Sequence, residues 1–152
     1  MALFTAAGLG VVIAESASVS GAEGGCQAEI GSAAAMAAAA AVELAGGTPE
    51  QTADAAALAL KSFLGLVCDP VAGLVEVPCV KRNAMAAVVS LTSAEMALAG
   101  IKSAIPVDEV IETMGSIGRD MPCSLKETAQ GGLAITPTGE KIRSRTTGLT
   151  TT

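Results

Sequence analysis

Three cysteines lie in stretches of the chain that are rich in proline and glycine, where a regular helix or strand is disfavoured. Cys68 and Cys79 are eleven positions apart, and Pro70 and Pro78 stand close beside them. Cys26 follows two consecutive glycines and lies 42 positions before Cys68. Irregular backbone can aim several sulfurs at one point, which a continuous helix or strand cannot do. The pattern therefore indicates a metal centre at which three thiolates converge.

The spacing of the thiols bears on the kind of metal centre. Structural zinc takes four ligands, commonly in closely spaced pairs, and this sequence has no such pair. An iron–sulfur cluster with three protein thiolates and one open iron fits the pattern better. Cys123 also has a proline neighbour but lacks a glycine-rich frame, so we expect it to be incidental. Free cysteine commonly behaves as a small buried hydrophobe, so a non-catalytic helical assembly module with buried free cysteines is the alternative interpretation.

Three polar side chains directly follow the last of these cysteines and are candidates to face a substrate: Lys81, Arg82 and Asn83. The guanidinium of Arg82 suits a bidentate pair with a substrate carboxylate. The alternative is that Lys81 and Arg82 simply begin a solvent-exposed helix. Asp69 and Glu76 are weaker candidates, because acidic side chains are common on surface loops.

The composition predicts one compact domain built from small side chains. Hydrophobic residues make up 51% of the 152 residues, which is enough for a core. Alanine dominates them, and Phe4 and Phe63 are the only aromatic residues, so the helices must pack closely. The net charge of −6 and the lack of a lysine or arginine run argue against nucleic-acid binding. Because the chain has no histidine, a general base must be a lysine, a carboxylate, a thiolate, a cluster-bound water or a group on another chain.

The cysteine and hydropathy patterns also bear on location. Four cysteines in an acidic, alanine-rich chain do not resemble the disulfide framework of a small secreted domain. The apolar residues at 1–13 follow no basic segment, which favours a core helix over a signal peptide. The longest apolar run, residues 32–42, is well short of the roughly 18 residues that predict a membrane span. We therefore expect a soluble, cytoplasmic protein that does not enter the membrane.

The expected fold is all-α: a compact bundle of about five alanine-rich helices with an irregular, cysteine-bearing loop. The strongest helix start is Thr48 followed by Pro49, with Gln51 completing a capping box. The predicted helices span about residues 2–16, 26–44, 49–63, 83–99 and 106–117, with a short helix after Pro122 and the cysteine loop at 64–80. Residues from Gln130 onward look extended or disordered. We predict a helical cluster-binding domain over residues 1–135 and a flexible tail over 136–152.

Three segments of the sequence resemble a known enzyme family. They are SVSGAEGGCQAEIGS at residues 18–32, LGLVCDPVAGLVEVPCVKRNA at 64–84 and KETAQGGLA at 126–134. Together they resemble the α chain of iron–sulfur-dependent L-serine dehydratase, and they look most like the type in which α and β are separate chains. The resemblance covers about residues 1–140, and the two cysteine-bearing segments are highly specific.

The resemblance implies a cofactor, a reaction and a partner. The family's four-iron four-sulfur cluster is held by three cysteines, which map onto Cys26, Cys68 and Cys79. Its α domain is all-helical, and the enzyme converts L-serine to pyruvate and ammonia without pyridoxal phosphate. The open iron binds the substrate as a Lewis acid. A β chain and an oligomeric assembly are the implied protein partners.

Two features of the sequence depart from the family pattern. Family α chains extend well over a hundred residues further toward the N-terminus, so the resemblance predicts that this sequence is a C-terminal portion. The β portion, which carries a serine- and histidine-bearing motif, is also missing. The family usually has another residue at position 123, which agrees with an incidental role for Cys123. We therefore expect this chain alone to lack a complete active site.

Overall fold

The computed structural model describes residues 1–149 as a helical protein. Its α-helices are α1 (Ala2–Ser16), α2 (Gly21–Gly24), α3 (Ser32–Leu44), α4 (Pro49–Lys61), α5 (Cys79–Leu98), α6 (Val107–Asp120) and α7 (Pro137–Leu149). A π-helical turn (Gln27–Gly31) precedes α3, and 3₁₀ turns lie at Val71–Gly73, Cys123–Leu125 and Gly132–Ile135. The described residues contain no β-strand, so the predicted all-α fold is confirmed.

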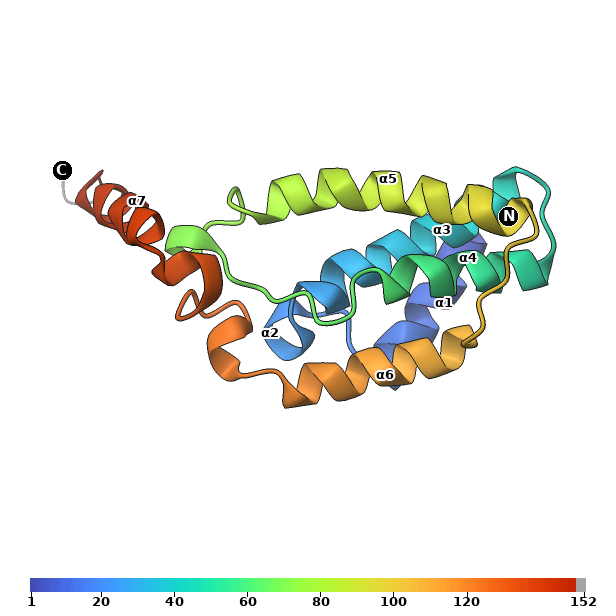
Figure 1. Cartoon of the computed structure of the whole chain (residues 1–152), viewed down its shortest axis with the longest axis horizontal. Coiled ribbons are helices and arrows are strands. Elements are labelled where there is room, and N and C mark those ends of the chain that lie inside the picture. Colours follow the sequence, from blue (N-terminus) through green and yellow to red (C-terminus); the bar gives the residue numbers. More distant parts are fainter. Residues whose placement is uncertain (150–152) are drawn as a thin grey trace.

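Helix α3 lies at the centre of the bundle, which accounts for its alanine-rich sequence. Helices α1, α4 and α5 pack against it, and α6 packs against α4 (Figure 1). Small side chains on a central helix let its neighbours approach closely on several sides. Helix α7 lies beyond one end of the bundle, at the far end of the long axis from the N-terminus (Figure 1).

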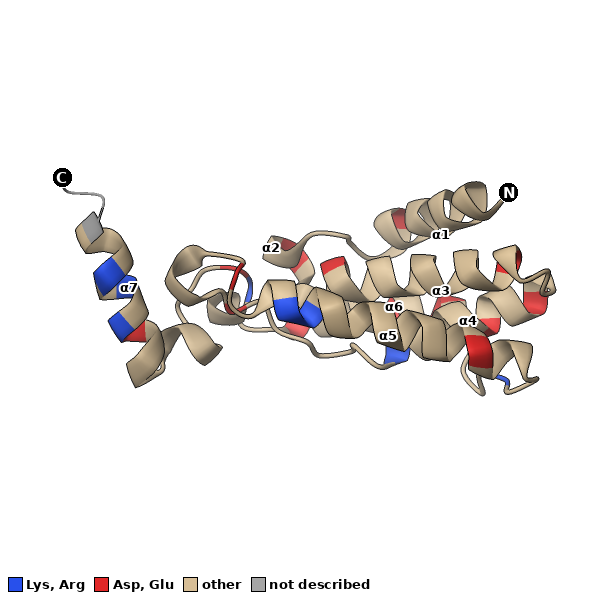
Figure 2. Ribbon diagram, turned by 90° about the horizontal axis from the view of Figure 1, so that it is seen from above, with Lys and Arg blue, Asp and Glu red and all other residues tan. Residues whose placement is uncertain are grey.

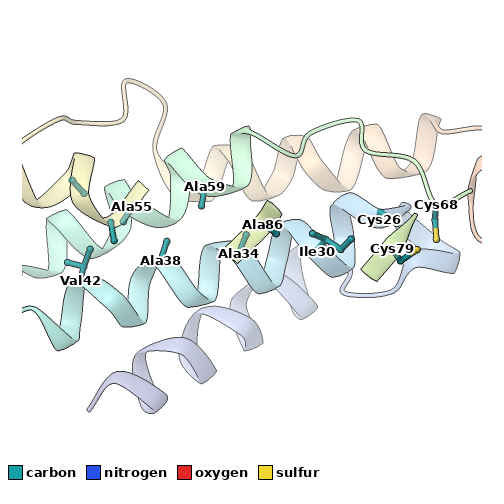
Figure 3. Close-up of a cluster of buried hydrophobic side chains, with 12 residues drawn as sticks. Cys26, Ile30, Ala34, Ala38, Val42, Ala55, Ala59, Cys68, Cys79 and Ala86 are labelled. Atoms are coloured by element: carbon teal, nitrogen blue, oxygen red, sulfur yellow. The ribbon is translucent and has the colours of Figure 1, made fainter. Parts of the chain in front are cut away.

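The main core joins α3, α4 and α5 and ends at the cysteines. Most of its members are alanines, so each contributes little area and the stabilisation comes from close packing. The buried members are Cys26, Ile30, Ala34, Ala38, Val42, Ala55, Ala59, Cys68, Cys79, Ala86, Ala94 and Ala97. Figure 3 shows the three cysteines at one end of this core. The packed core of the bundle therefore includes all three of these cysteines.

The start of α4 confirms the capping box predicted from sequence. The Gln51 N–H donates to Thr48 Oγ1 at 3.3 Å, and the Thr48 N–H donates to Gln51 Oε1 at 2.9 Å. Pro49 occupies the first turn, where a missing N–H costs nothing.

The prediction of extended chain from Gln130 onward is wrong for α7. Thr136 and Pro137 repeat the threonine–proline start of α4, and Thr136 Oγ1 accepts a hydrogen bond from the Gly139 N–H at 3.1 Å. The threonine- and glycine-rich composition of this segment favours irregular chain, but the cap at Thr136 starts a helix in spite of it. The final residues of the predicted tail, 150–152, lie outside the described residues, and the division at residue 135 stays a prediction.

The two helices predicted next to the cysteines differ in how well they agree with the structure. The chain is helical over the range predicted from Cys26 to Leu44, but its first turn is the π-helical turn, whose Gln27 N–H donates to the Leu66 carbonyl. The helix predicted from Asn83 begins at Cys79, directly after Pro78, which is compatible with a first helical turn. Two of the three cysteines therefore lie at the start of helical segments.

Within the described part of the chain, no helix is both long enough and apolar enough to cross a membrane. Apolar side chains are nevertheless exposed on two helices of the bundle. On α1 they include Leu3 and Phe4, and on α5 they include Met85, Val88 and Leu91. Figure 2 shows that the middle of α5 carries no charged residue.

Candidate metal centre

Three cysteine sulfurs from segments far apart in the sequence meet at one end of the bundle (Figure 3). The Sγ atoms of Cys26, Cys68 and Cys79 all lie within 4.8 Å of one another. All three residues are buried, and Cys26 has no exposed surface. The predicted convergence is confirmed, since ligands of one small metal centre must surround a common point. The three cysteines could therefore bind a metal.

The turn that carries Cys26 depends on the glycine before it. Gly25 has a φ of 77°, a left-handed conformation that side chains rarely adopt. A Cβ atom at this position would come within 2.9 Å of the Leu66 carbonyl oxygen and 2.7 Å of the Met121 sulfur. Glycine thus lets the turn approach the segment that leads to Cys68.

Gln27 ties the same turn to two other parts of the chain. Its side chain is fully buried, and its amide nitrogen donates to the Met114 carbonyl of α6 at 3.0 Å. Its Oε1 accepts from the Gly65 N–H at 2.9 Å. Sequence reasoning missed this residue, although a lone amide next to a cysteine in an alanine-rich stretch was a usable signal.

Cys68 lies in an extended segment that is held by the chain following α6. Its N–H donates to the Leu125 carbonyl at 2.8 Å, and its own carbonyl accepts from the Glu127 N–H at 2.9 Å. Cys68 thereby forms an isolated parallel bridge with Lys126. Glu127 has a φ of 66°, a strained conformation for a residue other than glycine, of a kind that clusters at functional sites. Residues 125–127 therefore hold the backbone of Cys68 in place.

The polar residues after Cys79 reach different surroundings. Lys81 is exposed, and its Nζ donates to the Glu76 carbonyl at 3.2 Å. Asn83 Nδ2 donates to the Cys79 carbonyl at 2.9 Å, which steadies the first turn of α5. Among these neighbours of Cys79, Arg82 is the one whose side chain contacts a cysteine sulfur.

The acids near the cysteines differ in burial, and Cys123 lies apart from the sulfurs. Asp69 is buried and pairs with Arg82, with 2.8 Å between Oδ1 and Nη1. Glu76 is exposed, and its backbone carbonyl accepts the bond from the Lys81 ammonium. Cys123 is exposed and stands outside the group of three sulfurs.

Glu29 is a carboxylate near the site that sequence reasoning missed. It faces Gly21, where a Cβ atom would come within 2.8 Å of the carboxylate. Burial and the nearby Glu127 raise the pKa of Glu29. Burial and the neighbouring sulfurs raise the pKa of both Cys68 and Cys79, and the negative charge of Glu29 raises it further. An acid three positions after Cys26 was the available signal.

Gly132 makes room for the buried carboxylate of Asp69. A Cβ atom at Gly132, which has a φ of 60°, would come within 2.6 Å of the Asp69 Cβ. We expect Gly132→Ala to lower the free energy of unfolding by about 1–3 kcal/mol, measured by chemical denaturation. Gly46→Ala is the matched control, because Gly46 has a φ of 77° but nothing within 4 Å of its Cβ position. Equal losses in the two variants would show that contact with Asp69 is unimportant.

The buried thiols make the stability of the metal-free protein depend on pH. Burial and the neighbouring Cys26 raise the pKa of Cys79 from an ordinary value of 9.0 to about 11, and burial above all raises that of Cys68. Because the folded protein holds these protons more tightly than the unfolded chain, the thiols stabilise the fold fully below pH 9. We expect the melting temperature of the reduced apoprotein to fall as the pH rises from about 9 to about 11. Cys79→Ser should flatten this decline, and an identical profile in the variant would refute the assignment.

Comparison with known proteins agrees with the geometry of the site. The family model for the serine dehydratase alpha chain matches residues 1–134. A probable L-serine dehydratase alpha chain of Bacillus subtilis (strain 168) is 65% identical over 146 residues, which are 96% of this chain and 49% of that protein. One from Latilactobacillus sakei is 60% identical over 146 residues, 96% of this chain and 70% of that protein.

A third relative, the L-serine dehydratase alpha chain of Peptoniphilus asaccharolyticus, is 55% identical over 139 residues. That match covers 91% of this chain and 48% of the relative. The chain thus spans about half the length of two of these three curated relatives. Because the family model covers most of the sequence, including all three cysteines of the site, the chain belongs to the serine dehydratase alpha chain family.

Proposed function

We propose that this chain is the cluster-binding part of an L-serine dehydratase, which deaminates L-serine to pyruvate and ammonia without pyridoxal phosphate. Its cofactor is a four-iron four-sulfur cluster, held by Cys26, Cys68 and Cys79. One observation carries the proposal: in a chain of this family, the three buried cysteine Sγ atoms all lie within 4.8 Å of one another.

The donor set fits an iron–sulfur cluster. Cysteine thiolates are the usual ligands of such clusters, and three of them leave one iron without a protein thiolate. When bound, the cluster supplies a Lewis acid that makes the substrate hydroxyl a better leaving group. The protein supplies the rigid, buried surroundings of the sulfurs, because each cysteine is fixed by backbone hydrogen bonds to another segment or lies in a first helical turn.

The polar groups around the site would bind the substrate and move a proton. Lys81 and Asn83 have exposed side chains at the start of α5, beside the site, and with Arg82 they are the proposed substrate-facing residues. The overall reaction removes a proton from Cα and hydroxide from Cβ, so it requires a base. Since the sequence has no histidine, the base is a carboxylate or amine of this chain, a thiolate, a cluster-bound water, or a group from another chain.

The proposed protein partners are the β chain of the same enzyme and further copies in an oligomer. The exposed apolar residues of α1 and α5 support such an assembly, because large apolar surfaces on a folded protein commonly mark interfaces. We place the enzyme in the cytoplasm, with no nucleic-acid or membrane partner.

Anaerobic reconstitution with iron and sulfide tests the proposal. We expect a brown protein with a broad absorption band near about 400 nm and about four irons per chain. A protein that stays colourless and retains four titratable thiols would instead favour the non-catalytic helical assembly module. Such a module would use the same alanine-rich core but leave its four free cysteines without a metal.

A further inference from the structure

Arg82, on the helix that begins with Cys79, contacts the other two cysteine-bearing segments through one nitrogen atom. Its Nη1 lies 3.8 Å from the Sγ of Cys26, within hydrogen-bonding distance for sulfur. The same atom donates to the Val67 carbonyl at 2.9 Å and to Asp69 Oδ1 at 2.8 Å, and these two residues flank Cys68. Arg82 also lies one helical turn after Cys79 on α5.

A buried carboxylate fixes the position of the guanidinium. The Asp69 side chain is 4% exposed, and its second oxygen accepts from the Leu133 N–H at 2.8 Å. The Arg82 side chain is 21% exposed, so part of its charge also meets solvent. Removing one partner of such a pair leaves an uncompensated charge in a poorly solvated place. Asp69 therefore holds Arg82 against the sulfur and offsets part of its positive charge.

Nη1 carries two hydrogens and has close oxygen acceptors in Val67 and Asp69, so the Cys26 sulfur at 3.8 Å shares one of these hydrogens and lies beside the positive charge of the guanidinium. Thiolates that bind iron carry negative charge, which a neighbouring guanidinium stabilises. Hydrogen bonds to the sulfurs of a cluster and the local charge together set its reduction potential. Residues that contact metal ligands also orient them, and their loss typically lowers metal affinity by about 10–100-fold.

We infer that Arg82 is a positioning residue that retains the cluster and raises its reduction potential through the positive charge that it holds beside the Cys26 sulfur, and that Asp69 moderates this effect. The inference rests on the proposed cluster function. It gives Arg82 a part beyond substrate contact, because the nitrogen that meets the sulfur is already bonded to Asp69 and Val67.

Two substitutions should move the potential in opposite directions. In the reconstituted protein, Arg82→Met removes the donor and the positive charge, so the potential becomes more negative. The affinity for the cluster should fall as well, so that about 10–100-fold less chelator removes half of the iron at equilibrium. Asp69→Asn keeps the shape but removes the offsetting negative charge, so the potential becomes more positive. A purely structural defect would lower the affinity for the cluster in both variants without this difference in sign. Potentials would be measured by a redox titration followed by electron paramagnetic resonance.

The controls separate this inference from the proposed function. Arg119→Met makes the same chemical change on an exposed part of α6 and should leave both quantities unchanged. Arg82→Lys keeps the charge, so its potential should lie between those of the wild type and Arg82→Met; circular dichroism checks that each variant is folded. If the wild type binds a cluster but the Arg82 and Asp69 variants match its potential, the role of Arg82 is wrong and the proposed function stands. If the wild type binds no cluster, the proposed function fails first.

Discussion

Replacing Cys68 by serine should empty the iron site, whereas the same replacement at Cys123 should leave the iron and sulfide contents unchanged. Cys68 is buried within 4.8 Å of the other two sulfurs, and its backbone is hydrogen-bonded to Leu125 and Glu127. A serine hydroxyl is a poor substitute for a thiolate in a cluster, and two remaining thiolates hold it weakly. Cys123 is exposed and lies outside the group of three.

Iron and acid-labile sulfide assays on the two reconstituted variants measure this difference. Cys123→Ser is a matched control, because it makes the same atom-for-atom change in the same chain. We expect nearly complete loss of iron in Cys68→Ser and wild-type iron in Cys123→Ser. Equal loss of iron in both would contradict the assignment of the ligands.

The second large effect concerns activity: this chain alone, with its cluster reconstituted, should not dehydrate L-serine measurably above background. It spans about half the length of two of the relatives it matches. A positioned general base typically contributes about 10²–10⁴-fold to the rate, and orientation of the substrate contributes more. A site that lacks the segments expected from the rest of the enzyme should lose both contributions.

Anaerobic assays of pyruvate formation would compare this chain, a full-length α chain, and the full-length α chain mixed with its β chain. We expect activity only in the last mixture. The iron content of each sample must be matched, so that loss of cofactor is not mistaken for loss of a partner. Substantial turnover by this chain alone would show that its own carboxylates, amines or thiolates provide a sufficient base.

The parts of the fold that were predictable have local causes. The start of α4 follows from Thr48, Pro49 and Gln51, which lie within four positions of one another. The glycines and prolines around the cysteines likewise argued against one continuous helix through all of the cysteine-bearing segments. The α7 start had the same local signal at Thr136 and Pro137, but the polar composition after it outweighed the cap in our interpretation. A threonine cap followed by proline therefore predicts a helix start better than the average composition of the segment does.

The convergence of the cysteines was predictable, but the groups that hold them in place were not. Gln27, Asp69 and Glu29 lie next to or near cysteines in the sequence, yet their roles depend on partners far along the chain. Gln27 bonds to Met114, 87 positions away, and Asp69 to Leu133, 64 positions away. Such contacts form only when the helices pack, so neither periodicity nor spacing reveals them.

The most direct test of the metal centre is anomalous diffraction at the iron absorption edge, on crystals of the anaerobically reconstituted protein. The account predicts a compact peak of about four irons bounded by the sulfurs of Cys26, Cys68 and Cys79, with one iron bearing no thiolate of this chain. Iron bound elsewhere, a single metal ion between the three sulfurs, or a site without iron would contradict it.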